Sequence, residues 1–162
     1  MMTPDRVACF LTELRVARLD DKYWRLIDLD LRYQDPSGTI IVVPVGFVTD
    51  FASVPRWLPI AYALTGGTAQ PAAVIHDWLY QTHAVDRATA DRVLWDAMGA
   101  LGEPLWRQWA MYRAVRLFGH PAYNSGPSRF RMSNLTLRGG TRLLVIPAGG
   151  PDSCARSGDG GY

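Results

Sequence analysis

The sequence of 162 residues has two cysteines, a single lysine and no long hydrophobic segment. No apolar run approaches the roughly 20 residues that a transmembrane helix needs, so we expect no membrane span. Cys9 and Cys154 are too few and too far apart for a disulfide framework or a metal-binding pair, and they favour a reduced, cytosolic environment. Residues 1–14 have no continuous apolar core, so we expect no cleaved signal peptide.

Charge is present in ordinary amount but is unevenly distributed. Hydrophobic residues make up 48% of the chain and charged residues 20%, which excludes a wholly disordered or coiled-coil protein. Sixteen arginines accompany the one lysine, and eight of the basic residues lie in residues 105–162 with only two acidic ones. Because these arginines are spread through a segment with little periodic pattern, direct nucleic-acid binding is not expected.

The first part of the sequence predicts a small antiparallel sheet. Apolar and charged side chains alternate from Tyr23 to Tyr33, the period of a strand with one buried face. Residues 35–38 (Asp-Pro-Ser-Gly) are typical of a tight turn, and the β-branched run 39–43 is expected to pair back as a hairpin. Residues 7–18 alternate less regularly and predict an edge strand.

The periodicity changes to that of helices after Pro44. Residues 72–81 are apolar on nearly every side, which predicts a buried helix with Pro71 in its first turn. Asp86 is a typical N-cap of a second helix that ends near Leu101, and residues 103–119 predict a third. A small N-terminal antiparallel sheet packed against about three helices is an α+β fold.

We expect one α+β domain over residues 1–123. Residues 124–162 are interpreted as a linker and a largely flexible tail, because Gly, Ser and Asp leave little to bury. Within that tail, residues 143–146 (Leu-Leu-Val-Ile) are compatible with one extra strand.

The densest group of small polar residues follows the predicted hairpin. Residues 43–56 include Thr49, Asp50, Ser53 and Arg56 where strand gives way to helix. A structural crossover, in which Asp50 and Ser53 cap backbone amides, explains this composition as well as a functional site does. In the functional interpretation, the Asp50 carboxylate faces a cleft at the end of a strand.

A second group of polar residues lies in the predicted buried helix. His76 and Tyr80 are four residues apart on one stripe, and Asp77 lies about 100° around the helix axis. Asp91 shares a face with Leu94 in the next helix and should point toward the core. We therefore expect the Asp91 carboxylate to accept the imidazole N–H of His76 across an antiparallel helix pair. Such a bond is equally typical of a buried polar pair that only stabilises the fold.

Three site chemistries fit these residues. A Ser53–His76–Asp91 triad is one, although Ser53 lacks the G-x-S-x-G elbow. A zinc site is a second, although no H-E-x-x-H motif is present. In the third, His76 is a base acting on water, Asp91 orients His76, and Asp77 with Asp50 binds Ca²⁺ or Mg²⁺ rather than Zn²⁺.

The order H-D-x-x-Y at residues 76–80 is similar to the catalytic helix of secreted phospholipases A2. The resemblance implies a His base, an adjacent calcium-binding Asp, a Tyr four residues on and an Asp on the next helix. It covers about thirty residues, and Leu79 stands where that family has a cysteine. The His-Asp doublet also resembles HD-domain phosphohydrolases, which need a further His upstream, and no His precedes His76.

The third predicted helix is rich in aromatic residues and arginine. We expect its aromatic side chains to lie in the core and its arginines at a solvated edge. A second interpretation makes Arg113 and Arg116 an anion clamp at the cleft. The aromatic residues are Trp106, Trp109, Tyr112 and Phe118.

Four segments together resemble a known family. They are residues 43–56 (V-P-x-G-F-x-T-D-F-A-S-V-P-R), 76–80 (H-D-W-L-Y), 90–91 (A-D) and 111–119 (M-Y-R-A-V-R-x-F-G). The family is encoded by tailed bacteriophages and prophages and is catalogued as a domain of unknown function, number thirteen fifty-three. The resemblance spans about residues 23–123. It implies a phage-derived protein often encoded near tail and lysis genes, and it implies no particular activity.

The sequence as a whole favours one polar site where residues 44–56 meet the His76 and Asp91 helices. We expect it to assist hydrolysis of an ester, phosphoester or amide. Two alternatives stay open: a non-enzymatic virion protein of the tail or its assembly, with a structural His–Asp network, and an inhibitor of a host protein. The expected partners are accordingly other virion proteins or a host protein, and the expected location is the host cytoplasm or the virion.

Overall fold

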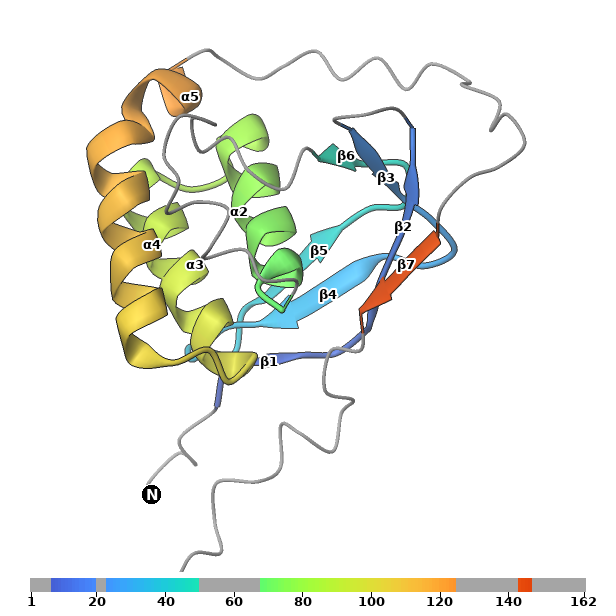
Figure 1. The fold of residues 1–162 in the computed structure, drawn as a ribbon, viewed down its shortest axis with the longest axis horizontal. Helices are drawn as coiled ribbons and strands as arrows, with labels where there is room; N and C mark the ends of the chain where they lie inside the picture. Colours follow the sequence, from blue (N-terminus) through green and yellow to red (C-terminus); the bar gives the residue numbers. More distant parts are fainter. Residues whose placement is uncertain (1–6, 20–22, 50–67, 125–142, 147–162) are drawn as a thin grey trace, which may run out of the picture.

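Two small antiparallel sheets and a group of helices form an α+β fold (Figure 1), the class that the sequence predicts. The structure is a computed structural model that describes residues 7–19, 23–49, 68–124 and 143–146. The helices gather on one side of the sheets. No helix in these ranges is long and apolar enough to cross a bilayer.

The first sheet contains the expected hairpin. Its strand order is β1-β4-β5, and Tyr33 of β4 lies opposite Ile41 of β5. At the turn, the backbone N–H of Asp35 donates to the carbonyl of Thr39 at 3.0 Å, and Gly38 adopts a φ of 89° that favours glycine. Cys9 in β1 is buried and disulfide-bonded, so the expectation of a reduced thiol there is wrong. The strands are β1 (Cys9–Phe10), β4 (Leu31–Gln34) and β5 (Ile40–Val43).

The second sheet joins parts of the chain that are far apart in sequence. Its order is β6-β3-β2-β7, all antiparallel. Val16 of β2 pairs with Leu144 of β7 on one side and with Leu26 of β3 on the other. The end of β6 at Thr49 lies opposite Trp24. The strands are β2 (Leu14–Arg18), β3 (Trp24–Leu26), β6 (Val48–Thr49) and β7 (Leu143–Ile146).

The single strand expected from Tyr23 to Tyr33 is divided between the two sheets. β3 ends at Leu26 and β4 begins at Leu31, and between them Asp28 has a φ of 67°. Aspartate tolerates this left-handed backbone better than most residues, and the conformation breaks a strand. Asp30 then accepts the backbone N–H of Val45 at 2.8 Å. The expected alternation holds in β4, where Leu31 and Tyr33 are buried, but it does not extend across the turn, because Leu26 is buried in β3.

The helices begin and end close to the expected positions. Pro71 lies in the first turn of α2, where its missing N–H costs nothing. Asp86 caps α3 by accepting the backbone N–H of Thr89 at 3.0 Å and its hydroxyl at 2.7 Å. A short fourth helix was not predicted. The helices are α2 (Gln70–Thr82), α3 (Arg87–Ala100), α4 (Leu105–Phe118) and α5 (His120–Asn124).

The core lies where α2 and α3 cover the strands. It includes Phe10 and Tyr33 from the first sheet, whose ring centroids are 5.0 Å apart, and Ile75 and Met98 from the helices. Nine of the thirteen residues of α2 are buried. Burial of a large apolar side chain contributes about 1.5–3 kcal/mol, so packing rather than helix propensity holds α2 in place. Polar side chains on α2 are consequently enclosed with it.

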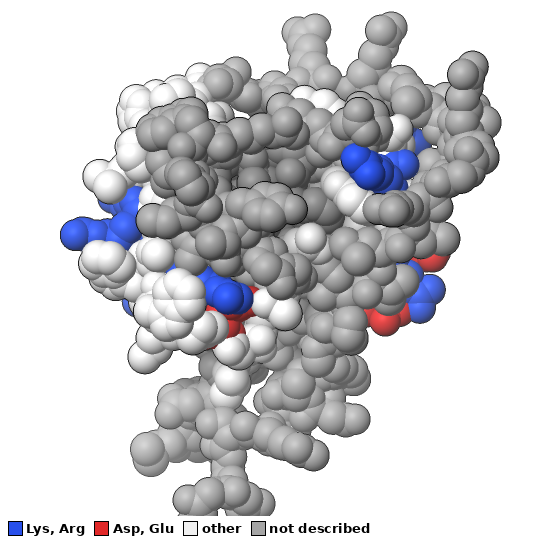
Figure 2. All heavy atoms as spheres, viewed as in Figure 1, with Lys and Arg blue, Asp and Glu red and all other residues white. Residues whose placement is uncertain are grey.

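The aromatic residues of α4 do not lie in the core, contrary to expectation. Trp106 is 62% exposed and Trp109 is 55% exposed, whereas Gln108 is buried. Gln108 donates to the carbonyl of Glu103 at 2.6 Å and lies against Gly99 of α3, which has no side chain in the way. The α4 helix therefore directs Gln108 toward α3, and its two indole side chains are exposed. Figure 2 shows uncharged and basic side chains along the α4 edge of the molecule.

Candidate functional site

The candidate site begins on α2, where three polar or ionisable side chains are buried. His76, Asp77 and Tyr80 are each no more than 8% exposed. The rings of His76 and Tyr80, one turn apart, have centroids 4.1 Å from each other. Because α2 packs against both the strands and α3, these groups must find partners within the protein.

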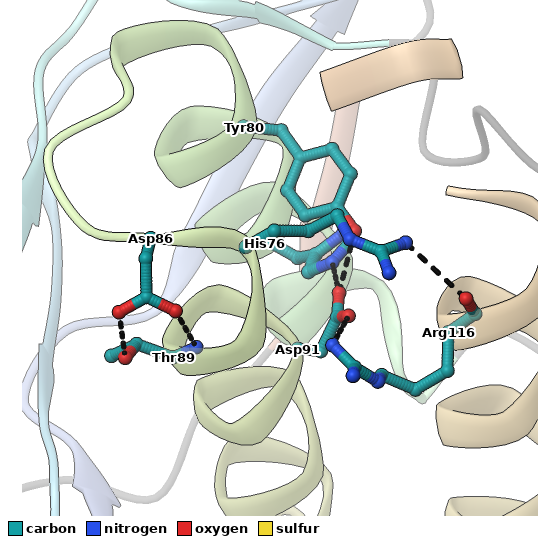
Figure 3. Close-up of polar contacts among 7 residues, drawn as sticks. His76, Tyr80, Asp86, Thr89, Asp91 and Arg116 are labelled. Atoms are coloured by element: carbon teal, nitrogen blue, oxygen red, sulfur yellow. Dashed lines mark hydrogen bonds and ion pairs between the residues drawn. The ribbon is translucent and has the colours of Figure 1, made fainter. Parts of the chain in front are cut away.

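Asp91 on α3 supplies the partner of His76 (Figure 3). Nε2 of His76 lies 3.0 Å from Oδ1 of Asp91, and the Tyr80 hydroxyl donates to the same oxygen at 2.6 Å. Arg116 of α4 donates to the other oxygen, Oδ2, at 3.3 Å. Asp91 itself is 0% exposed. The hydrogen bond expected between His76 and Asp91 is present, and the carboxylate joins three helices.

The surroundings of Asp91 favour its ionised form. Burial acts to raise the pKa of the carboxyl, but the hydrogen bonds from His76 and Tyr80, together with Arg116, outweigh burial and lower that pKa. Burial raises the pKa of the Tyr80 hydroxyl, and its hydrogen bond to Asp91 acts in the same direction. Asp91 is therefore a buried carboxylate, and Tyr80 is a neutral donor beside it.

The ionisation of Asp91 determines which nitrogen of His76 carries hydrogen. A carboxylate only accepts hydrogen bonds, so Nε2 must donate. In the neutral imidazole, Nδ1 then holds the lone pair. In the described part of the chain, Nδ1 makes no hydrogen bond, and the His76 side chain keeps 10% of its surface exposed. The arrangement gives a basic nitrogen with a fixed orientation at the edge of the core.

Arg116, not Arg113, is the arginine of this site. Arg87 donates to the backbone carbonyl of Arg116 at 3.2 Å, which ties the start of α3 to the end of α4. Arg113 is exposed, and its guanidinium lies 4.9 Å from the ring centroid of Trp109. The two arginines thus have different partners, Trp109 for Arg113 and Asp91 for Arg116.

Asp77 faces a second element, β6. The hydroxyl of Thr49 donates to Oδ2 of Asp77 at 2.6 Å, and both side chains are buried. The last residue of β6 is thereby bonded to the middle of α2. The bond lies next to the peptide that leads into Asp50. Of the predicted site residues, Asp50, Ser53 and Arg56 lie outside the described residues.

Oxygen atoms are the available ligands around Asp77. The Asp77 carboxylate and the Thr49 hydroxyl are hard donors of the kind that Ca²⁺ and Mg²⁺ prefer to the nitrogen and sulfur ligands typical of Zn²⁺. Within the described ranges, no three His, Cys, Asp or Glu side chains gather closely enough to hold a metal ion. A cation at Asp77 would therefore need ligands beyond the described carboxylate, imidazole and thiol side chains.

Glu103 is a buried acidic residue that sequence reasoning missed. The hydroxyl of Thr68 donates to it, and Arg107 donates to its other oxygen at 2.8 Å. These contacts fasten the start of α2 to the start of α4. In the sequence, Glu103 and Pro104 indicate only the start of a helix. Thr68, the partner of Glu103, is too distant in the sequence for a local pattern to predict their hydrogen bond.

Comparisons with known proteins place these residues within a recognised sequence family. The profile of a family described as "Protein of unknown function (DUF1353)" matches residues 24–115, which include Thr49, His76 and Asp91. The chain is 35% identical over 92 residues to the uncharacterized protein y4jT of Sinorhizobium fredii (strain NBRC 101917 / NGR234). That match covers 56% of this chain but 27% of the relative. No solved structure matches the chain.

Proposed function

The chain belongs to the DUF1353 family, whose description assigns no activity, and from its buried site we propose that it is a hydrolase using His76 to activate water. The observation that carries the proposal is the hydrogen bond from Nε2 of His76 to the ionised Asp91. Three donors from two other helices meet this carboxylate and favour its ionised form. Here those donors hold one imidazole in one tautomer.

The proposed step is a proton transfer at Nδ1 of His76. Nδ1 takes a proton from a water molecule while the water oxygen attacks an ester, phosphoester or amide. The imidazolium that forms is stabilised by Asp91, and it returns the proton to the leaving group. General-base catalysis of this kind contributes about 10²–10⁴ to a rate. Asp91, Tyr80 and Arg116 position the base and do not touch the substrate.

Asp77 has a separate role in the proposal, as a ligand of a hard divalent cation. Together with Asp50 it would bind Ca²⁺ or Mg²⁺, and Thr49 orients its carboxylate. Such a cation would polarise the carbonyl or phosphoryl oxygen of the substrate. Ser53 is the alternative nucleophile, and Arg56 is a candidate for binding an anionic substrate group. An origin in a phage or prophage gene remains part of the proposal and is supported by the four sequence segments.

The histidine tautomer is the first test, because it needs no substrate. We expect nitrogen-15 NMR of the histidine-labelled protein to show neutral His76 protonated at Nε2, and Asp91→Asn to change that signal. A His76 protonated at Nδ1 would contradict the proposal. His120→Ala removes an exposed histidine that contacts Asn124 and serves as the control for assignment and activity.

Hydrolysis is the second test. Chromogenic carboxylic esters, phosphomonoesters and phosphodiesters should include one substrate that the wild-type protein cleaves. For that substrate, His76→Ala should lower kcat about 10²–10⁴-fold, whereas His120→Ala should leave it unchanged. Equal rates of hydrolysis for His76→Ala and the wild type would contradict the proposal. Thermal shifts with Ca²⁺, Mg²⁺ and EDTA test the cation separately.

A non-enzymatic assembly protein is the second candidate, and the exposed aromatic residues of α4 favour it. In that case the His76 and Asp91 network only stabilises the fold. His76→Ala would then lower the Tm while neither cations nor EDTA shifted it, and no substrate would be cleaved.

A further inference from the structure

The outer face of α4 is apolar along its whole length. Every exposed residue of this helix except Arg113 is a large hydrophobic one. In Figure 1, α4 lies at the edge of the molecule, and no described element covers its far side. We call this surface the α4 face, and its residues are Leu105, Trp106, Trp109, Arg113, Leu117 and Phe118.

The size of the α4 face is that of a protein interface. Its five hydrophobic side chains are between 41% and 72% exposed, and together they present roughly 600 Å² of apolar area. A stable complex buries about 800 Å² on each partner. The apolar side chains alone therefore supply most of the surface that one half of a standard interface needs. Tryptophan and arginine are also the residues enriched at the centres of interfaces.

The charge on the α4 face argues against an anionic surface as its partner. Arg113 is the only charged group on the face, and its guanidinium already lies over the ring of Trp109. The other two arginines of α4 are paired with buried acidic residues, Arg107 with Glu103 and Arg116 with Asp91. A single cation gives little attraction to anionic lipid, whereas a mainly apolar surface of this size fits a surface like itself.

The order of residues on the α4 face is nearly symmetric about the middle of the helix. Trp106 near its start corresponds to Leu117 near its end, and the two lie on the same side of the helix. Trp109 corresponds within one residue to Arg113. A two-fold axis perpendicular to α4 would thus bring Trp106 of one helix against Leu117 of a second helix that runs antiparallel. Most homodimers use such a two-fold interface, in which one patch meets itself.

We propose that two copies of this chain associate through their α4 faces, with the two helices antiparallel. Trp106 of each copy packs on Leu117 of the other. At the centre, the guanidinium of Arg113 approaches Trp109 of the second copy, a cation–π contact that accommodates the charge without an acidic partner. This interface is independent of the proposed hydrolysis, because no residue of the α4 face contacts His76 or Asp91.

Sedimentation equilibrium from low to high micromolar concentration measures the association. The 18.0 kDa chain should reach the mass of a dimer, and Trp109→Asp should shift it to the monomer. Ile40→Ser, which changes an exposed apolar residue on β5, is the matched control and should leave the dimer intact. Far-UV circular dichroism checks that each variant is folded. A wild-type chain that stays monomeric overturns the proposal. Binding of that monomer to vesicles of anionic phospholipid would show that the α4 face contacts a membrane instead.

A mixing experiment tests the antiparallel arrangement. Trp106→Glu and Leu117→Lys should each weaken self-association, because each places a charge against an apolar residue at both ends of the interface. An equimolar mixture should recover the dimer, since one end then pairs Glu with Lys while the other end keeps the native Trp106–Leu117 contact. Monomers in the mixture would show that these helices do not pair in this way. Dimers formed by either variant alone would show the same.

Discussion

Replacing Asp91 with asparagine should destabilise the protein by about 3 kcal/mol. The substitution keeps the shape but removes a charge that three donors share. It also places an amide N–H beside the guanidinium of Arg116. Removing one partner of a buried ion pair costs about 3–5 kcal/mol. The lower end of this energy range applies here, because the Arg116 side chain is 37% exposed and can turn toward water. For a domain of this size the loss corresponds to a Tm lower by roughly 10 °C.

The difference between wild type and Asp91→Asn should depend on pH in a defined direction. The pKa of Asp91 is lower in the folded protein than in the unfolded chain, where it is about 3.9. The stabilisation is therefore complete above about pH 4 and is lost as pH falls through the folded pKa. Urea unfolding near pH 7 and near pH 3 should show a large difference at the first pH and a smaller one at the second.

Two results would refute this reasoning about Asp91. A loss below about 1 kcal/mol near pH 7 would mean that the ionised carboxylate contributes no more than an ordinary hydrogen bond. A difference that stays constant with pH would mean that its charge is irrelevant. Asp28→Asn is the control, because Asp28 is exposed and asparagine tolerates its positive φ. It should change the free energy of unfolding by less than about 0.5 kcal/mol.

Three further substitutions test other contacts. Gly119→Ala should cost about 1–3 kcal/mol in urea unfolding, because a Cβ there would lie 2.6 Å from the Tyr80 hydroxyl oxygen and also meet the carbonyl of Val115. Thr49→Val should cost about 1.5–3 kcal/mol in the same assay, since it removes the hydroxyl that donates to buried Asp77. Asp96→Asn should raise the Tm near pH 7 and not below pH 4, because burial raises the pKa of this carboxyl and folding therefore disfavours its charge. Unchanged stability would show, for each variant, that the close approach at Gly119, the hydrogen bond of Thr49 or the burial of Asp96 does not exist in solution.

Patterns among neighbouring residues were sufficient to predict the helices and the hydrogen bond between His76 and Asp91. The helical period, Pro71 and the Asp86 cap depend on neighbouring residues, and they located α2 and α3. Asp91 shares its helix face with apolar residues, so its burial followed from the same period. His76 on the preceding helix could be predicted as one partner of Asp91, whereas Arg116 could not.

Contacts between distant segments were not predictable in the same way. The left-handed backbone at Asp28 divides one alternating sequence segment between two sheets, and the alternation of residue types does not reveal that break. The rotation of α4 depends on how Gly99 and Gln108 meet, so composition alone placed Trp106 and Trp109 in the core. The bond from Arg116 to Asp91 depends on that same rotation.

The three donors around Asp91 also determine how the helices open. The carboxylate belongs to α3, and its partners belong to α2 and α4, so separating either neighbouring helix from α3 leaves a buried charge with fewer donors. That cost opposes the fraying of one helix alone. Backbone amides in the middle of α2, α3 and α4 should therefore exchange with deuterium as one cooperative unit, at a rate set by the opening of all three helices together.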